Sequence, residues 1–344
     1  MELFPLCGMQ ILANISMDKK RILLFAEHSA WGAASNFNEM FSNSNKYESI
    51  EIVAHNGGKN GYSFGQDRNL RKEQYSRSEE IKALIEDPSA IFFIFDVNGL
   101  HLFLKCMNEL GENIKNRPLN IFWSGNPYIA NHLACNEWVD KSGVTPFAML
   151  DLISYNKKSI PLMQPYNTEI LEEIKIKSPK VEGLNDFVIC HSPGHKGRGN
   201  EKGTNIIKSA IDSLNPVNSI KISYNQLGSE TWLTHSECLL EKAKCDLFID
   251  KIGSLSAGGI GKSGIEGICM GIPTLSAMHK STISGRYESL DQITCNSGDT
   301  LISEINRLIA DTEYYQERQG QMKNLSNLFS YKNTLEYIEQ EMSK

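Results

Sequence analysis

Short apolar runs alternate along this chain with segments in which apolar residues recur at helical spacing. In the first half the runs end at turn residues, as strands buried on both faces do, and the segments between them have the spacing of helices. The expected strands lie at 22–26, 50–54, 90–95 and 119–123, and the expected helices at 36–41, 78–85 and 100–110. Strands that alternate with helices predict a parallel sheet covered on both faces.

The same alternation restarts in the second half of the chain. Strands are expected at 187–190, 220–224, 247–249 and 273–276, and helices at 204–214, 231–243 and 264–271. Between the halves, residues 155–185 are richer in Lys, Pro and Glu and hold one short expected helix at 169–176. The apolar spacing of 333–342 predicts a last amphipathic helix, free to pack across either half.

Two α/β halves of similar layout predict two Rossmann-like domains, in keeping with a length of 344 residues. Residues 1–16 are interpreted either as an extension ahead of Met17 or as a short amphipathic segment. After the extension at 1–16, we predict a first domain at 17–160 and a linker at 161–185. A second, nucleotide-binding domain is predicted at 186–325. Residues 326–344 are predicted to form a C-terminal helix that crosses back to the first domain.

Composition and charge argue against several classes of protein, among them nucleic-acid binders and membrane-spanning proteins. The formal net charge of −6 gives no overall attraction to polyphosphate, which argues against a dedicated nucleic-acid binder. The eight cysteines form no C-x-x-C pair, so we expect reduced thiols rather than a zinc knuckle. No apolar run approaches the roughly 20 residues of a membrane span, and the cations at 19–21 follow the apolar start instead of preceding it. These features predict a cytoplasmic protein with no transmembrane segment.

The loops that follow strands are the expected places for chemistry, because ligands bind beyond the carboxyl ends of parallel strands. The first such loop, residues 191–204, holds four glycines and the cations Lys196, Arg198 and Lys202 between a strand and a helix. Glycines let the backbone approach a ligand, cations neutralise phosphate, and the helix start adds a favourable dipole. The loop therefore suits a diphosphate, and the alternative is a solvated basic loop.

A second glycine-rich loop, residues 254–267, also joins a strand to a helix. Its backbone N–H groups predict an anion-binding concavity, and Glu266 would accept hydrogen bonds from ribose hydroxyls. One alternative is a capping box, with Ser263 as N-cap and Glu266 reaching back to its N–H. Another is a P-loop NTPase, since Gly261-Lys262-Ser263 matches the end of that motif. Against it, Ser256 replaces the first glycine, and the later strand does not end in Asp.

The loops of the first half, 27–35, 96–99 and 124–127, are expected to cluster at one edge of its sheet. His28 and Asp96 each follow a strand and are candidates for general-base work or acceptor handling. For His28 the alternative is a hydrogen-bonded turn residue. The remaining residues expected on this acceptor side are Trp31, Gly32, Ser124 and Gly125.

The second half resembles the group 1 (family 4-like) retaining glycosyltransferases, over roughly residues 187–280. Lys202-Gly203-Thr204 is similar to the phosphate-binding "KG" turn of that family. Residues 243–250 and 266–275 are similar to its "ADivid … EAmalGkPvi" segment, in the same order and spacing. Residues 329–332 are similar to its closing "FSwe" segment, whose helix returns to the first domain.

The resemblance implies a GT-B fold, in which two Rossmann-like domains face each other across a cleft. It further implies an enzyme that transfers a sugar, with retention, from a nucleoside-diphosphate donor. Lys202, together with Arg198 or Lys196, would bind the diphosphate, and Glu266 would bind the ribose. The implied donor-binding set is Lys196, Arg198, Lys202, Gly203, Gly258, Gly259, Ile260, Gly261 and Glu266, and the expected catalytic set is His28, Asp96 and Lys202.

One position departs from the family pattern. Many members carry a second Glu eight residues before the ribose-binding one, and Gly258 stands there in this chain. Contact with the transferred sugar must then come from backbone amides or from another side chain. A member with an altered donor, or with lost activity, stays open.

The sequence also lacks the D-x-D metal motif of the other main glycosyltransferase fold, because no two Asp residues lie two apart. Lysine, arginine and helix dipoles are therefore expected to stabilise charge without a metal or other cofactor. On the same fold, a nucleotide-sugar 2-epimerase and a non-catalytic sugar-nucleotide-binding protein remain as alternatives. The expected partners are a nucleotide-sugar donor and an acceptor that is a saccharide, a lipid-linked sugar, a small molecule or a modified nucleobase, and the oligomeric state is left open.

Overall fold

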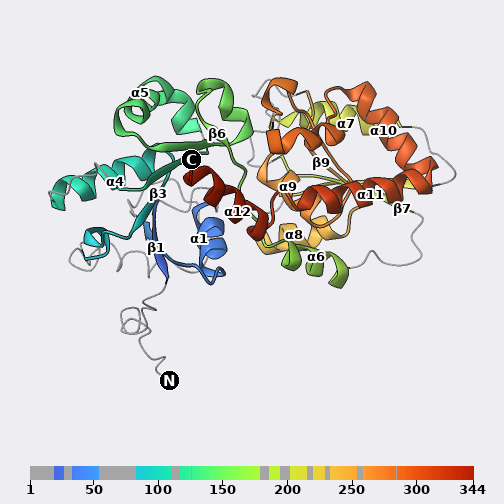
Figure 1. The fold of residues 1–344 in the computed structure, drawn as a ribbon. Helices are drawn as coiled ribbons and strands as arrows, with labels where there is room; N and C mark the ends of the chain where they lie inside the picture. Colours follow the sequence, from blue (N-terminus) through green and yellow to red (C-terminus); the bar gives the residue numbers. More distant parts are fainter. Residues whose placement is uncertain are drawn as a thin grey trace, which may run out of the picture.

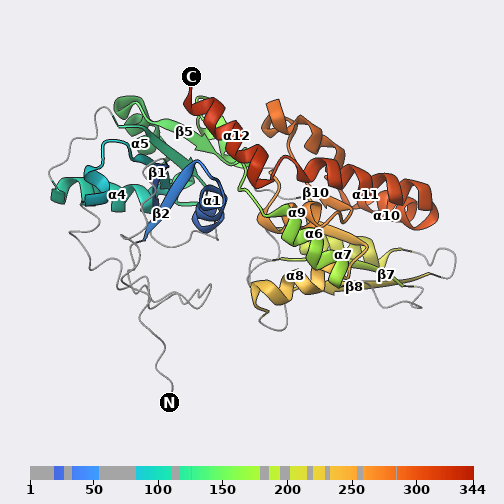
Figure 2. The ribbon, with the colours of Figure 1, turned by 60° about the horizontal axis from the view of Figure 1, so that its bottom comes forward.

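In the computed structural model two α/β domains lie side by side, and the C-terminal helix crosses between them (Figures 1 and 2). The structure describes residues 19–26, 33–53, 83–110, 117–124, 126–178, 186–193, 202–214, 220–228, 233–253, 259–283 and 285–344. Within these residues we find no helix with the length and apolar character that a membrane crossing requires.

The first domain is built on a six-stranded sheet of order β2-β1-β3-β4-β5-β6, in which all strand pairs are parallel. Its strands are β1 (Lys20–Ala26), β2 (Tyr47–Val53), β3 (Ile91–Phe95), β4 (Leu119–Trp123), β5 (Thr145–Ala148) and β6 (Ile160–Pro161). Its helices are α1 (Ala33–Ser42), α4 (Asp96–Leu110), α5 (Asn126–Ser142) and the 3₁₀ helix η2 (Leu150–Tyr155).

Both faces of the first sheet are covered, as the continuous apolar runs of β1 and β3 require. Successive residues of a strand point to opposite faces, so Leu23 and Phe25 enter the core cluster that includes α4 and α5. Ile22 and Leu24 enter a second cluster that includes α1 and the last helix.

The second domain repeats this plan on a smaller, four-stranded parallel sheet of order β10-β9-β7-β8. Its strands are β7 (Asp186–His191), β8 (Lys221–Gln226), β9 (Leu247–Lys251) and β10 (Thr274–Ser276). Its helices are α7 (Thr204–Asp212), α8 (His235–Ala243), α9 (Lys262–Cys269), α10 (Gly298–Ala310) and α11 (Thr312–Ser326), with the 3₁₀ helices η4 (Lys280–Thr282) and η5 (Gly285–Ile293).

Two segments join the domains. Helix α6 (Thr168–Lys177), in the predicted linker, packs against α8 and α9 of the second domain. Helix α12 (Tyr331–Met342) packs against α1 of the first domain, where the Lys46 ammonium lies 2.7 Å from the Glu339 carboxylate. Just before these two helices begin, their chains are joined by a hydrogen bond, in which the N–H of Tyr166 donates to the carbonyl of Phe329 at 2.8 Å.

The predicted fold class is confirmed, since the chain forms two α/β domains with parallel sheets. The expected loop at 96–99 is wrong, because these residues form the first turn of α4 directly after β3. Asp96 makes this abrupt start possible by adopting a positive φ of 59°. Helices α5 and α11 were not predicted, because no clear apolar stripe marks either of them.

Candidate functional site

The Lys202-Gly203 turn lies between β7 and α7, at the carboxyl end of the second sheet. Gly203 is the N-cap of α7, with φ of 70°, and a Cβ there would lie 1.8 Å from the carbonyl oxygen of Ile252. Only glycine fits such a position. The N–H of Ile252 donates to the carbonyl of Lys202 at 3.1 Å. The turn is therefore fixed against the chain that leaves β9.

The ammonium of Lys202 is held at this edge by two acceptors. It donates to the Ser192 carbonyl at 2.9 Å and to Asp250 Oδ1 at 3.2 Å. The side chain remains 26% exposed. Because an ammonium carries three N–H groups, and the described residues take two of them, the third can donate to a ligand.

His191, the last residue of β7, holds the Lys202-Gly203 turn in place by hydrogen bonds. Its Nδ1 lies 2.8 Å from the carbonyl oxygen of Ile249, which can only accept, so Nδ1 carries the proton. Nε2 then accepts from the Thr204 hydroxyl at 3.0 Å. Burial lowers the pKa of His191 to about 4, which keeps the ring neutral at pH 7. His191 is thus a positioning residue for the start of α7.

Asp250, at the end of β9, joins the two loops of the site. It is fully buried, and besides Lys202 it accepts from the Gly261 N–H at 2.8 Å and the Ser276 hydroxyl at 3.2 Å. Burial by itself raises the pKa of Asp250, but the charges of Lys202 and Lys251 and the Gly261 N–H outweigh burial and bring the pKa to about 2. The carboxylate is therefore ionised and orients both the lysine and the glycine loop.

In the described part of the glycine loop, residues 259–261, the N–H of Gly261 departs from the expectation that the loop backbone faces the donor. Ile260 buries its side chain in the core, so only its backbone can face a ligand. Gly261 gives its N–H to Asp250 rather than to an anion. Gly261 is also the N-cap of α9, which begins at Lys262, two residues earlier than predicted. The amides that this helix start offers are those of its first turn.

Glu266 lies on α9 and is 3% exposed. Its Oε2 accepts from the Lys242 ammonium at 2.7 Å, and its Oε1 lies 2.8 Å from His235 Nε2. Burial raises the pKa of Glu266, yet the charge of Lys242 and the His235 contact lower it well below the usual range. Lys242 is itself 1% exposed, whereas the His235 side chain is 42% exposed. The Oε1 side of the carboxylate is therefore the side nearer to solvent.

The capping-box interpretation of Ser263 and Glu266 is wrong. The N-cap of α9 is Gly261, and no side chain caps the helix. Ser263 instead offers its hydroxyl and its carbonyl to the Lys242 ammonium, at 2.9 and 2.8 Å. Because α9 starts at Lys262, earlier than predicted, Glu266 does not cap the helix. Its carboxylate contacts Lys242 and His235 of α8 instead.

In the first domain, Asp96 and Ser124 come together at the carboxyl ends of β3 and β4. Asp96 is 6% exposed and accepts from the Val97 N–H at 2.9 Å, while the Ser124 hydroxyl lies 3.5 Å from Asp96 Oδ2. Gly99 lets α4 approach the sheet, since a Cβ there would lie 2.4 Å from the carbonyl oxygen of Phe25. Asp96 therefore starts a helix at this edge, in addition to any role toward a ligand.

Several predicted site residues lie outside the described part of the chain. They are His28, Trp31, Gly32, Gly125, Lys196, Arg198 and Gly258. Their roles stay predictions.

The site also contains residues that sequence reasoning did not assign. Asp250 and Lys251 close the buried strand β9, and Lys242 and His235 lie on the helix before it. A charged pair at the end of an otherwise apolar strand was a signal that could have found Asp250 and Lys251. No local signal identifies Lys242 or His235 as partners of Glu266, because they lie 24 and 31 residues away in the chain.

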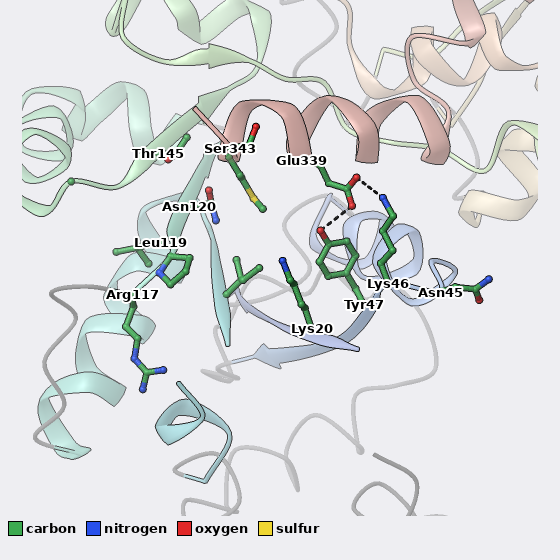
Figure 3. A pocket seen from close by; sticks show the side chains of 14 residues that line it. Lys20, Asn45, Lys46, Tyr47, Arg117, Leu119, Asn120, Thr145, Glu339 and Ser343 are labelled. Carbon is green, nitrogen blue, oxygen red and sulfur yellow. Dashed lines mark hydrogen bonds and ion pairs between the residues drawn. The ribbon is translucent and has the colours of Figure 1, made fainter. Parts of the chain in front are cut away.

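A separate hollow of about 870 Å³ lies at the opposite, amino-terminal edge of the first sheet (Figure 3). The starts of β1, β2 and β4 and the end of α12 line it. Three of its charged groups are engaged: Glu339 accepts from Lys46 and from the Tyr47 hydroxyl, and Arg117 donates to the Ile85 carbonyl at 2.9 Å. The hollow is therefore distinct from the strand ends that carry Lys202 and Asp250. Among the described residues, no group of His, Cys, Asp and Glu side chains is arranged to hold a metal ion.

No known protein family matches the sequence, and no curated protein matches it either. Solved structures do match. HepE (Alr3699) from Anabaena in complex with UDP is similar with a TM-score of 0.58 and 10% identity, over 94% of this chain and 99% of the other. The same protein in complex with UDP-glucose is similar with a TM-score of 0.57, 10% identity and the same coverage.

An α-glucosyltransferase in complex with UDP and a 13-mer DNA is similar with a TM-score of 0.58 and 11% identity, over 94% of this chain and all of the other. At such identities the likeness is one of fold. These matches include GT-B glycosyltransferases. The chain therefore has the GT-B fold, two Rossmann-like α/β domains joined by a linker and by a returning C-terminal helix.

Proposed function

We propose that this protein transfers a sugar from a nucleoside-diphosphate donor to an acceptor bound between the two domains. One observation carries the proposal. Lys202, Asp250 and the start of α9 meet at the carboxyl ends of β7 and β9, where the order of the strands reverses. This is the place where open parallel sheets bind nucleotides.

The charges at this place suit a diphosphate leaving group. As the bond between sugar and phosphate breaks, negative charge develops on the phosphate oxygens. The third N–H of Lys202 and the starts of α7 and α9 would stabilise that charge more than the ground state. Asp250 would keep Lys202 oriented, because its carboxylate is ionised and accepts a hydrogen bond from the Lys202 ammonium.

We assign the nucleoside to the neighbourhood of Glu266. A carboxylate that is kept ionised accepts hydrogen bonds from ribose hydroxyls. Oε2 is held by the buried Lys242, so Oε1, next to the more exposed His235, is the oxygen we assign to the ribose. Lys242 and His235 would act as positioning residues for this contact.

The similar structures supply the first donors to test. HepE was crystallised with UDP-glucose, and the α-glucosyltransferase with UDP. We therefore propose UDP-glucose as the first probe, followed by GDP-, ADP- and CMP-sugars. We further propose that transfer proceeds with retention and without a metal ion. EDTA should leave the rate unchanged, and the anomeric configuration of the product, measured by NMR, should match that of the donor.

Calorimetric titration of the full chain tests the proposal. Lys202→Gln removes the charge but keeps a hydrogen-bond donor toward Asp250, and Lys208→Gln removes the same charge from an exposed position on α7. We expect the parent and Lys208→Gln to bind one nucleotide sugar equally. We expect Lys202→Gln to bind it about 10- to 100-fold more weakly, because a charged hydrogen bond to phosphate is lost.

The outcomes separate the alternatives. If the parent binds no nucleotide sugar, or if Lys202→Gln binds it as well as the parent does, the proposed site is wrong. Conversion of the donor sugar at C2 without any acceptor would identify an epimerase. Binding without turnover of any acceptor would identify a non-catalytic binding protein. ATP or GTP hydrolysis that Lys262→Gln abolishes would identify an NTPase instead.

A further inference from the structure

Asp151 brings a carboxylate of the first domain to the edge of the second. It lies in the first turn of η2, close after the end of β5. The residue before it, Leu150, is buried in the core cluster of the second domain together with Ile260. The residue after it, Leu152, is buried in a core cluster of the first domain. The backbone at Asp151 is thus held between the two domains.

The glycine loop of the second domain lies directly against Asp151. A Cβ at Gly259 would lie 3.0 Å from the Asp151 N atom and 3.2 Å from its Cβ. A side chain at Gly259 would therefore push Asp151 away. This close approach places the Asp151 side chain beside the loop that leads into α9, within the region to which we assign the donor.

Lys251 is the last residue of β9 and directly follows Asp250 at the carboxyl end of that strand. It is 8% exposed, and its charge lowers the pKa of both Asp250 and Asp151. The positive charge of Lys251 therefore acts both on Asp250 of the second domain and on Asp151 of the first. Within the described residues, neither the Lys251 ammonium nor the Asp151 carboxylate forms an ion pair or a hydrogen bond with another side chain.

The burial of the Asp151 and Lys251 charges lowers the stability of the folded chain. Burial raises the pKa of Asp151, and the charge of Lys251 and the backbone N–H of Asp151 itself offset this only in part. Largely buried charges without a salt-bridge partner destabilise a protein. Strand-end positions that carry such groups are candidates for ligand contact.

We propose that Lys251 and Asp151 contact two parts of one donor: Lys251 binds its diphosphate, and Asp151 accepts a hydrogen bond from a hydroxyl of the transferred sugar. The inference rests on the proposed function. Lys251 directly follows Asp250 at the carboxyl end of β9, beside the strand end that Lys202 reaches, and so adds a second cation to the place that we assign to the phosphates. A carboxylate repels phosphate and accepts from hydroxyls, so the sugar is the part of the donor beside Asp151. The donor then contacts both domains at once.

Titration with UDP and with UDP-glucose tests the two contacts separately. For Asp151→Asn we expect UDP to bind within twofold of the parent, and UDP-glucose to bind about tenfold more weakly, since one hydrogen bond from a hydroxyl to a charged group is weakened. For Lys251→Met we expect both ligands to bind at least tenfold more weakly. Asp140→Asn, on the exposed face of α5, should bind both ligands as the parent does.

Thermal unfolding of the unliganded variants separates a substrate contact from a structural role. Asp151→Asn should unfold at the same temperature as the parent or at a higher one, because it removes a poorly solvated charge. A structural role would lower the unfolding temperature. If the parent binds neither ligand nor any other nucleotide sugar, both proposals are wrong. If Lys202→Gln weakens binding while Asp151→Asn binds UDP-glucose as the parent does, only the present inference is overturned.

Discussion

The two sheets place an aspartate and a serine at equivalent positions and surround them differently. Asp96 directly follows β3 and Asp250 is the last residue but one of β9, and both strands lie next to the point where the strand order reverses. Ser124 and Ser276, at the ends of the neighbouring strands, each approach their aspartate, at 3.5 and 3.2 Å. In both domains a glycine lets the backbone pass close to a carbonyl at the end of an adjacent strand or just beyond it. The two domains therefore share a scaffold for a strand-end site.

The difference lies in charge and in the role of the carboxylate. Val97 follows Asp96, whereas Lys251 follows Asp250, and Lys202 reaches Asp250 from the next loop. Asp96 accepts from the N–H of its own helix, while Asp250 holds a lysine and the glycine loop together. Similar scaffolds thus carry a cationic site in the second domain and a helix start in the first. The difference teaches that the charged side chains at the strand ends, rather than the shared scaffold, distinguish the second domain, to which we assign the diphosphate, from the first.

The largest expected effect concerns the two glycines. Gly203→Ala combines a left-handed φ with a Cβ 1.8 Å from a carbonyl oxygen, whereas Gly99→Ala has only the steric conflict, at 2.4 Å. We expect Gly203→Ala to lower the free energy of unfolding by about 3 kcal/mol or more. Gly99→Ala should cost less, because alanine is also a better helix former. Urea denaturation of both variants measures this, and an equal loss would contradict the stronger constraint at Gly203.

An intermediate effect concerns the charge of Asp250. Its pKa of about 2 in the folded chain lies below the ordinary value of 3.8. Such a carboxylate stabilises the fold above its unfolded pKa, and the contribution disappears as the pH falls through the folded pKa. The full contribution is about 2 kcal/mol. Asp250→Asn should therefore be less stable than the parent at pH 6, and the gap should narrow by about 1 kcal/mol at pH 3.

Urea denaturation at several pH values measures this gap. Asp140→Asn, which removes one exposed negative charge, serves as the control. A gap between the parent and Asp250→Asn that does not change with pH would show that the carboxylate is not the charged anchor of the site.

The smallest expected effect concerns the two serines. Ser276→Ala removes a buried hydrogen bond of 3.2 Å to Asp250 and should cost about 1 kcal/mol. Ser124→Ala removes a contact of 3.5 Å to Asp96 and should cost less than about 0.5 kcal/mol. Chemical denaturation at neutral pH compares them, and a larger cost at Ser124 would reverse the proposed difference between the two strand ends.

Much of the fold and part of the site could be predicted from local sequence. The run at 119–123 is the strand β4 to the residue, because a buried parallel strand is mostly apolar, and Asn120 is the one polar residue in it. Lys202-Gly203 was placed correctly at a helix start, because the helical apolar spacing that begins after it is a local signal. The apolar spacing of α10 was also readable, at Leu301, Ile305 and Leu308, although we did not predict that helix.

The sequence by itself determined the two α/β domains, the glycine positions and the lysine that we assign to phosphate, because periodicity and turn chemistry act over a few residues. Only the tertiary structure decided that Glu266 pairs with Lys242 and His235 instead of capping its own helix. It also decided that Asp151 of the first domain lies against Gly259 of the second. Contacts of this kind join residues far apart in the chain, and their geometry follows from how helices and sheets pack, which no local pattern records.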